Sequence, residues 1–504
     1  MLTSDFIWFL AYVLVLVGMA GYGFHRLVII FLYWKHRKNC PMPKGKFDEL
    51  PIVTIQLPMF NERFVVDRLL ESVALIDYPK DKLEIQILDD SIDETTQLCY
   101  DKAAELRERG FDCICLHRSD RTGYKAGALE EATKVAKGEF LFILDADFQP
   151  KSDVLMNIIH YFTDEKVGLV QTRWGHINRE CNLLTRVQGM FLDGHFVMEQ
   201  TARNRSGRFF TFNGTAGMWR KCTILDAGGW DHDTLTEDMD LSYRAQMKGW
   251  QFIFLKDVVT PAELPVDMDG FKAQQHRWTK GSIQVCQKML LDIWRSNAPL
   301  KAKLEATTHL TANYAYLLLI LLCFLIYPVA MKHIDFQSSL FVILLNLALF
   351  FFASIAVCIF YVSAQVAIRP RTWWKELPYL PVLLALGIGM SVNNSKAVLE
   401  AVFGHQSSFV RTPKYGIGQA TNRKQAGTLR KNGYKAIKSI LIPVLELAFG
   451  LFFLVMIVQM LQNGKYMSSI LMSPFLGFFY TSFCSLGRMI ANLMPTRQTD
   501  RSQN

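Results

Sequence analysis

Long apolar runs on both sides of a charged central region constrain the fold of this chain more than any other feature. Residues 6–34 form an apolar segment longer than the roughly 20 residues that a helix needs to cross a bilayer. Hydrophobic residues make up 50% of the 504 residues and charged residues 20%, too apolar for an ordinary soluble protein and too charged for one buried wholly in lipid. The sequence therefore predicts a membrane protein with one large soluble domain.

Further apolar runs follow the charged region. Runs at about residues 310–330, 340–364, 440–461 and 469–493 are long enough to span a bilayer, whereas residues 377–390 suit only an interfacial or re-entrant segment. The first run lacks a basic stretch before it and a small-residue cleavage site, so we interpret it as an anchor and not as a removable signal peptide. Together with that anchor, these runs predict five spans.

Basic residues beside the spans predict the orientation, because Lys and Arg collect on the cytoplasmic side. Lys35, Arg37 and Lys38 follow the first span directly, and further basic residues cluster at 369–375 and 411–438. We therefore expect the charged region and the C-terminus in the cytoplasm. The choice among a plasma membrane, an inner membrane and the Golgi is left open by the sequence.

The charged region begins with a strand, a helix and a second strand. Residues 52–58 are predicted as a strand, residues 65–75 as a helix, and residues 83–88 as a strand that stops at Asp89 and Asp90. This pattern predicts an α/β domain with a mostly parallel sheet. Ligands of such sheets bind at the carboxyl ends of the strands, which is where both aspartates are expected.

A second pair of carboxylates follows another predicted strand, at residues 139–144. Asp145 and Asp147 offer the hard oxygen ligands that Mg²⁺ or Mn²⁺ takes while sharing a diphosphate. Helix capping or loop solvation is the alternative interpretation of such a pair, but the buried strand before it disfavours that alternative. Lys125, in a glycine-bordered turn, can supply positive charge to a nucleotide.

Two later motifs add acid–base and anion-binding groups. Asp238 lies at a predicted helix start, where it either caps the helix or serves as the general base for an incoming hydroxyl. Arg277 can hold a leaving diphosphate. Trp278 offers a flat face to a sugar ring, with a core or membrane-interface Trp as the alternative.

The order of these motifs resembles the family 2 inverting glycosyltransferases, which include cellulose, chitin and hyaluronan synthases. The motifs are, in order, Asp89 with Asp90, Asp145 with Asp147, Thr236 to Asp238, and Gln274 to Trp278. Their local sequence is most similar to the cellulose-synthase-like A and C branches, which make β-1,4-mannan or glucomannan and the β-1,4-glucan backbone of xyloglucan. The resemblance implies a GT-A domain, an α/β fold that binds nucleotide sugars, joined to transmembrane helices.

The resemblance also implies roles for individual residues. Donor-binding roles fall on Asp89, Asp90, Lys125, Asp145, Arg277 and Lys414; metal binding falls on Asp145 and Asp147, and the catalytic base would be Asp238. Acceptor-binding roles fall on Phe212, Asn213, Gly214, Thr215, Gln274 and Trp278. Phe409, Thr412 and Lys414 match the gating loop that closes over the nucleotide in processive synthases.

These expectations divide the chain into five parts. They are an anchor at 1–35, a cytosolic GT-A domain at 36–297 that ends in interfacial helices, two spans at 298–368, an interfacial or re-entrant segment with the gating loop at 369–438, and two spans with a short cytosolic tail at 439–504.

The predicted function is processive synthesis of a β-1,4-linked glycan from a nucleotide sugar, with export of the product through the spans. UDP-glucose is the preferred donor and GDP-mannose stays open. The alternatives are a non-processive transferase that glycosylates a membrane lipid, as ceramide glucosyltransferases do, and an inactive membrane scaffold. The gating-loop residues favour the polymerase over the lipid transferase, and the retained carboxylates disfavour the scaffold.

Cysteine spacing and net charge exclude other classes. The 10 cysteines include no C-x-x-C pair, so neither a zinc site nor a disulfide framework is expected. The net charge of +9 is assigned to cytoplasmic loops beside anionic lipid, and no basic and aromatic stripe indicates nucleic-acid binding. The expected partners are a nucleotide sugar, a growing β-glycan and membrane lipids; a homo-oligomer or an accessory export subunit is left open.

Overall fold

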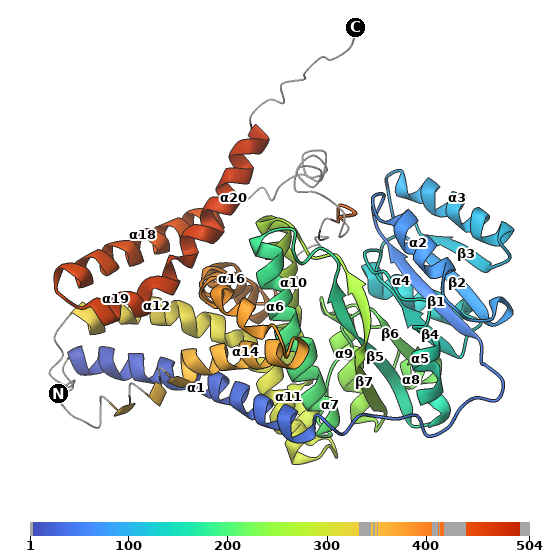
Figure 1. The fold of residues 1–504 in the computed structure, drawn as a ribbon, viewed down its shortest axis with the longest axis horizontal. Coiled ribbons are helices and arrows are strands. Elements are labelled where there is room, and N and C mark those ends of the chain that lie inside the picture. Colours follow the sequence, from blue (N-terminus) through green and yellow to red (C-terminus); the bar gives the residue numbers. More distant parts are fainter. Residues whose placement is uncertain are drawn as a thin grey trace, which may run out of the picture.

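A seven-stranded sheet forms the centre of one half of the molecule (Figure 1). This computed structural model describes residues 4–331, 344–345, 348–349, 351–405, 412, 414–417 and 440–493. The strands are β1 (Val53–Met59), β2 (Leu83–Asp89), β3 (Asp112–His117), β4 (Phe140–Ile143), β5 (Val167–His176), β6 (Gly217–Arg220) and β7 (Gln251–Ala262).

Most strand pairs in this sheet are parallel. The order is β3-β2-β1-β4-β6-β5-β7, and only β6 runs antiparallel to its neighbours. The α/β class and the mostly parallel sheet predicted from the sequence are thereby confirmed. The antiparallel β6 was not predicted, because its four residues are too few to show the two-residue alternation of apolar side chains that identifies a strand.

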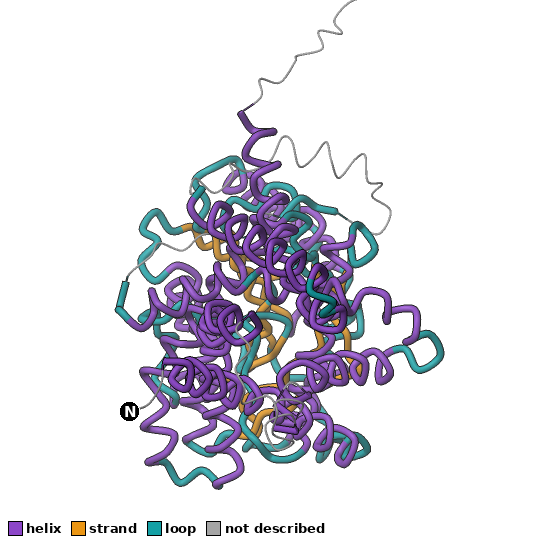
Figure 2. The backbone as a smooth tube through the Cα atoms, turned by 90° about the vertical axis from the view of Figure 1, so that its left-hand side faces the viewer, coloured by secondary structure: helices purple, strands orange, loops and turns teal. Residues whose placement is uncertain are grey.

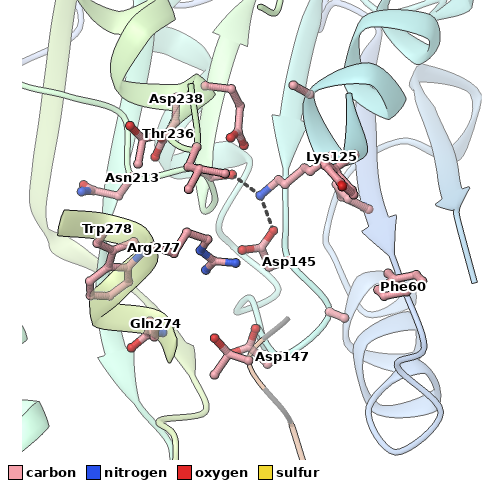
Figure 3. A pocket seen from close by; sticks show the side chains of 18 of the residues that line it. Phe60, Lys125, Asp145, Asp147, Asn213, Thr236, Asp238, Gln274, Arg277 and Trp278 are labelled. Atoms are coloured by element: carbon pink, nitrogen blue, oxygen red, sulfur yellow. Dashed lines mark hydrogen bonds and ion pairs between the residues drawn. The ribbon is translucent and has the colours of Figure 1, made fainter. Parts of the chain in front are cut away.

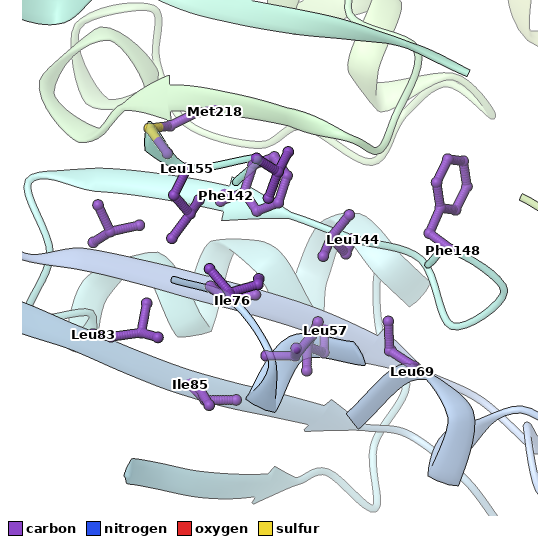
Figure 4. Close-up of a cluster of buried hydrophobic side chains, with 14 of the residues drawn as sticks. Leu57, Leu69, Ile76, Leu83, Ile85, Phe142, Leu144, Phe148, Leu155 and Met218 are labelled. Carbon is purple, nitrogen blue, oxygen red and sulfur yellow. The ribbon is translucent and has the colours of Figure 1, made fainter. Parts of the chain in front are cut away.

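Apolar side chains cover the sheet on both faces. Along β4, Phe140 and Phe142 face one cluster, which includes Leu69 and is shown in Figure 4, while Leu141 and Ile143 face a second cluster. The first face carries α2 (Val66–Ala74), α3 (Thr95–Glu108) and α5 (Met156–Ile159); the second carries α4 (Tyr124–Val135), α8 (Lys221–Asp226) and α9 (Glu237–Met247). Full burial of one such side chain contributes about 1.5–3 kcal/mol to the stability of the folded domain. Because both faces are buried, the sheet holds the ends of its strands in fixed positions.

Helices make up the other half of the molecule, and Figure 2 shows them lying in front of the strands. They are α1 (Ser4–His36), α6 (Leu183–Asp193), the π-helix η3 (Gly194–Gln200), α7 (Thr201–Arg205), α10 (Met268–Arg295), α11 (Leu300–Thr311), η4 (Ala312–Tyr314), α12 (Ala315–Met331), the π-helix η6 (Phe351–Ile355), α14 (Ala356–Ile368), η7 (Trp373–Tyr379), α15 (Leu380–Gly389), α16 (Ser391–Val402), α18 (Leu441–Gln462), α19 (Tyr466–Met472), η8 (Ser473–Leu476) and α20 (Gly477–Leu493).

Five of the described helical runs are long and apolar enough to cross a membrane. They are Ile7–His36, Leu300–Ile326, Phe351–Ile368, Trp373–Val402 and Leu441–Gln462. The segment at 377–390, expected to be interfacial or re-entrant, lies within the run at 373–402, in which α16 follows α15. Within this run, Asn393 and Asn394 are buried, and Asn393 donates to the Lys272 carbonyl at 3.1 Å.

Helix α10 connects the sheet to the helical half and lies between them in Figure 1. Asp267 caps its N-terminus by accepting a hydrogen bond from the Gly270 amide at 2.8 Å, and Arg488 of α20 forms an ion pair with the same carboxylate. One turn later, Lys272 contacts the buried Glu446 of α18 at 2.6 Å. Any side chain carried by α10 is therefore fixed with respect to both halves.

Candidate active site

A cavity of about 820 Å³ lies at the carboxyl ends of the strands. Its size is within the range of ligand sites. Side chains from several strand ends and helix starts line it, including Phe60, Asp90, Lys125, Asp145, Asp147, Trp174, His176, Asn213, Asp238, Gln274, Arg277, Trp278 and Lys414. In Figure 3, Phe60 and Trp278 lie on opposite sides of Asp145.

Lys125 joins the wall of the cavity to its carboxylates. It lies in the first turn of α4, which follows Gly123 at a φ of 73°, a conformation that glycine adopts without strain. Its Nζ donates to Asp145 Oδ1 at 2.5 Å and to the Gly214 carbonyl at 2.8 Å, as the dashed lines in Figure 3 show. Burial alone would lower the pKa of Lys125, but the carboxylates of Asp145 and Glu237 outweigh it and raise that pKa, so the ammonium stays charged.

Asp145 and Asp147 follow β4 and both line the cavity. The Asp145 amide donates to Thr215 Oγ1 at 2.8 Å, and Asp147 Oδ2 accepts from Lys414 Nζ at 2.6 Å. The described residues contain no group of three or more His, Cys, Asp or Glu side chains placed to hold a metal. The pair nevertheless fits Mg²⁺ or Mn²⁺, because such ions bind through one or two carboxylates and complete their shell with phosphate and water.

Asp238 is a carboxylate whose pKa is raised by its surroundings. It lies in the first turn of α9, and its Oδ1 accepts a hydrogen bond from the Met239 amide at 2.9 Å. Burial, and then the neighbouring charge of Glu237, raise the pKa of Asp238 to about 7. A Cβ on Gly214 would stand 3.2 Å from Asp238 Oδ2, so this glycine lets the loop pass beside the carboxylate. A carboxyl group with a pKa near 7 is suited to accept a proton at neutral pH.

Three residues of the fixed helix α10 face the cavity. Arg277 and Trp278 follow Gln274 by three and four residues, a spacing that places all three on one side of a helix. Burial lowers the pKa of Arg277, and the charges of Glu237 and Asp145 oppose that shift. The Trp278 ring lies 6.5 Å from the ring of Trp174, so two aromatic faces border this side of the cavity.

A hydrogen-bonded chain holds Asn213 at the same side. Gln200 Nε2 donates to both the Thr211 carbonyl at 2.8 Å and Asn213 Oδ1 at 2.7 Å, which fixes the orientation of both amides. Asn213 Nδ2 faces His195 Nε2 at 3.0 Å. Burial, then the charges of Arg203 and Arg26, lower the pKa of His195 to about 3, so the neutral ring accepts this hydrogen bond.

The family known as Glycosyl transferase family group 2 matches residues 140–368, the part of the chain that carries Asp145, Asp238 and Arg277. This chain contains a glycosyltransferase family 2 domain. The resemblance stated from the order of the motifs is therefore confirmed.

One curated relative and one solved structure are similar to this chain. Glucomannan 4-beta-mannosyltransferase 2 of Arabidopsis thaliana is 40% identical over 286 residues, which are 54% of this chain and 53% of that protein. The chain thus matches about half the length of this curated relative. A solved structure of the mannosyltransferase PcManGT from Pyrobaculum calidifontis, in complex with GDP-Man and Mn²⁺, has a TM-score of 0.54 and 19% identity, covering 78% of this chain and 100% of that one. At this identity the likeness shows the fold, and it supports the GT-A class.

Of the other residues predicted from the sequence, some line the cavity and some are buried behind it. Asp89 is fully buried, with His117 Nδ1 at 2.7 Å from its Oδ2, whereas Asp90 lines the cavity and is held by Arg118 at 2.7 Å. Phe212 and Thr215 are buried behind the cavity wall. Of the loop they belong to, Asn213 and Gly214 line the cavity.

The gating-loop residues are described in part. Phe409 lies outside the described residues, while Thr412 and Lys414 line the cavity. Lys414 Nζ also donates to the Glu263 carbonyl at 2.7 Å, and the Glu263 carboxylate accepts from the Tyr415 amide at 2.9 Å. The segment is thereby fixed against the end of β7, beside Asp147.

Several cavity residues were not among those predicted, among them Phe60, Arg121 and His176. Phe60 follows β1, and the Arg121 guanidinium lies 3.3 Å from the centre of its ring. Phe60 lies in a loop at the carboxyl end of a strand, where ligands of such sheets bind, so its position in the cavity could have been predicted from the sequence. His176 ends β5 and lines the cavity from the side of Trp174. Nothing in its sequence neighbourhood distinguishes His176 from a histidine in the core.

Proposed function

We propose that this protein is a membrane-embedded inverting glycosyltransferase that adds hexose units from a nucleotide sugar to a β-1,4-linked glycan. The observation that carries the proposal is the single cavity in which Asp238, whose pKa is raised to about 7, stands with Asp145, Lys125 and Arg277. An acid–base group and a set of phosphate-binding charges are the two requirements of sugar transfer from a nucleoside diphosphate.

In the proposed reaction, the acceptor hydroxyl oxygen attacks the anomeric carbon of the donor. As the new C–O bond forms, the bond from that carbon to the diphosphate breaks, and the leaving diphosphate takes the electron pair. The proton of the attacking hydroxyl passes to Asp238. Attack from the face opposite the leaving group inverts the anomeric centre, so one base suffices.

Positive groups on this chain stabilise the leaving diphosphate. Lys125 stays charged beside Asp145, and Arg277 projects from α10 into the same cavity. Asp145 and Asp147 would hold Mg²⁺ or Mn²⁺, which supplies further positive charge to the diphosphate. The ring of Trp278 would stack an acceptor sugar, with Asn213 and Gln274 as polar contacts beside it.

The donor is proposed to be GDP-mannose, because the Arabidopsis relative is named as a mannosyltransferase and PcManGT was solved with GDP-Man. UDP-glucose, preferred from the sequence alone, is the second donor to test. Both donors carry a nucleoside diphosphate, and Phe60 with Arg121 offers a flat surface on which either base would stack.

The helical half supports processive synthesis and export. Helix α10 carries Trp278 and is fixed to α20 and to α18, which is long and apolar enough to cross a membrane, so the acceptor side of the cavity adjoins the helical half. Lys414 contacts Asp147 inside the cavity, which supports a gating role for its segment. We place the catalytic domain on the cytoplasmic side, on the basis of the basic residues after the first span.

The proposal is tested with the full chain reconstituted in lipid vesicles. It is incubated with labelled GDP-mannose or UDP-glucose and with Mg²⁺ or Mn²⁺. We expect a labelled polymer that stays in the aqueous phase and is cut by an endo-β-1,4-mannanase or, from UDP-glucose, an endo-β-1,4-glucanase. Label that extracts into organic solvent on a lipid with one or two sugars would instead establish the lipid-transferase alternative.

A further inference from the structure

A histidine that belongs to none of the recognised motifs opens onto the cavity. His176 is the last residue of β5, and its side chain is 6% exposed. Side chains two residues apart project to the same face of a strand, so His176 and Trp174 share a face. The Trp174 ring is the neighbour of the Trp278 ring, at 6.5 Å. His176 therefore belongs to the aromatic side of the cavity.

The strand order separates His176 from the donor-binding end. Phe60 and Asp90 follow β1 and β2, whereas β4 and β6 lie between β1 and β5. Three strand spacings of about 4.8 Å place the carboxyl end of β5 some 14 Å from that of β1. Strand β4, which Asp145 follows, lies between them. His176 therefore lies closer to the proposed acceptor end of the cavity than to the proposed nucleotide end.

A buried carboxylate holds one nitrogen of the His176 ring. His176 Nε2 lies 3.3 Å from Asp193 Oδ1, and Asp193 Oδ2 accepts from Gln365 Nε2 at 3.1 Å and pairs with Arg369 at 3.4 Å. Burial would raise the pKa of Asp193, but the hydrogen bond from His176 and the charge of Arg369 hold that pKa well below its usual range. An ionised carboxylate only accepts hydrogen bonds, so Nε2 donates to Asp193, and Nδ1 is the ring nitrogen left for another partner.

The backbone after Asp193 supports the same side of the cavity. The π-helix η3 begins at the next residue, and π-helical turns occur frequently at functional sites. From this turn, His195 and Gln200 hold Asn213, and the Phe196 ring packs 4.9 Å from the Trp174 ring. The segment from Asp193 to Gln200 thus contacts His176, Trp174 and Asn213. A histidine buried only for packing would not need to share its supporting segment with two other cavity residues.

We propose that His176 is an acceptor-binding residue, whose Nδ1 accepts a hydrogen bond from a hydroxyl of the glycan while Asp193 fixes the ring and its tautomer. The ligand is a hydroxyl-bearing sugar of the acceptor chain. This inference rests on the proposed function, since it assigns His176 to the acceptor end of the same site. Asp193 is a positioning residue, because it acts on the acceptor only through the His176 ring.

The test compares acceptor and donor kinetics of the full-length protein in vesicles. His176→Phe keeps a planar ring and removes the hydrogen bond. With labelled GDP-mannose and β-1,4-mannotetraose, the acceptor KM should rise about 3- to 10-fold, the effect of losing one net hydrogen bond. The donor KM and the slow hydrolysis of donor without acceptor should stay within about twofold of wild type. An unchanged acceptor KM, or an equal rise in the donor KM, would overturn the proposal.

Two further variants separate binding from folding. Asp193→Asn should raise the acceptor KM in the wild-type background and leave it unchanged in the His176→Phe background, because its effect passes through the ring. Equal rises in both backgrounds would overturn the role of Asp193. His36→Phe, a histidine-to-phenylalanine change at the end of α1 and outside the cavity, is the matched control and should leave both KM values unchanged.

The result also distinguishes this inference from the proposed function. A wild-type protein that makes no glycan from either donor overturns both. An active wild-type protein whose His176→Phe variant binds the acceptor normally overturns the inference alone.

Discussion

The two sides of the cavity are built in different ways. On the donor side, charged residues follow consecutive parallel strands and pair with each other, as Lys125 does with Asp145 and Arg118 with Asp90. On the acceptor side, aromatic and amide side chains come from β5, a π-helix and α10, and they are held by contacts that reach into the helical half. Charge therefore dominates where a diphosphate would bind, and shape with hydrogen-bond direction dominates where a neutral glycan would bind.

The largest expected effect comes from the carboxylate between the two sides. Asp238→Asn removes the base and keeps the shape, so kcat should fall by about 10²- to 10⁴-fold, while the donor dissociation constant changes little. Transfer is measured with labelled donor and binding by calorimetry. Glu108→Gln, an equivalent change of an exposed carboxylate on α3, is the control. Full activity of the purified Asp238→Asn variant would contradict the assignment of the base.

Removal of divalent cations should act on the donor side alone. With EDTA, transfer should fall by at least about tenfold and return with Mg²⁺ or Mn²⁺, because the diphosphate would lose its counter-charge at Asp145 and Asp147. Binding of β-1,4-mannotetraose, measured separately, should not change. Full transfer activity in EDTA would show that Lys125 and Arg277 suffice without a metal.

The pH dependence follows from the pKa of about 7 at Asp238. The base must be ionised, so kcat/KM should rise about tenfold per unit as pH increases towards 7 and then level off. The same shift makes a stability prediction. The folded protein holds this proton to a higher pH than the unfolded chain, whose carboxyl titrates near 4, so the stability contribution is complete below about 4 and is lost as pH rises through 7. A flat rate profile between pH 5 and 7 would contradict the role of Asp238.

Lys414 tests whether its segment acts at the donor side. Lys414→Met removes the contact to Asp147 and should reduce polymer synthesis by about tenfold, with shorter products, because the charge-assisted hydrogen bond is worth about 1.5–3 kcal/mol. Product length is measured by gel filtration. Lys151→Met, at an exposed position outside the cavity, is the control. An unchanged rate and product length would remove the gating assignment.

Two aromatic substitutions have the smallest expected effects, and each should change the KM of only one substrate. Trp278→Leu should raise the acceptor KM by about 3- to 10-fold, and Phe60→Leu should raise the donor KM by a similar factor, since stacking on one ring is worth about 0.5–1.5 kcal/mol. Each variant is the control for the other in a two-substrate titration. If both variants change the same KM, the division of the cavity into donor and acceptor sides is wrong.

The sequence predicted the donor side better than the acceptor side, for a physical reason. A parallel strand ends at one edge of the sheet, so a carboxylate just after an apolar run can be placed without a structure, as with Asp145. The mostly parallel sheet and the glycosyltransferase family followed from the same strands and from the order of the motifs.

The remaining features depend on contacts between distant residues. His176 acquires its partner from Asp193, at the end of another helix, and Asn213 acquires its orientation from Gln200. The π-helix η3 has no pattern that separates it from the end of α6. Asn393 likewise acquires the partner of its amide from α10, at the Lys272 carbonyl.

The stereochemistry of a single transfer tests the central claim most directly. GDP-mannose and UDP-glucose both carry an α-linked hexose, and a cavity with one base at Asp238 is proposed to invert that linkage. Wild-type protein in vesicles is given donor and β-1,4-mannotetraose, or cellotetraose with UDP-glucose, and the anomeric proton of the added sugar is observed by NMR. The account predicts a β linkage to the 4-hydroxyl. An α-linked product, formed with retention, would contradict it.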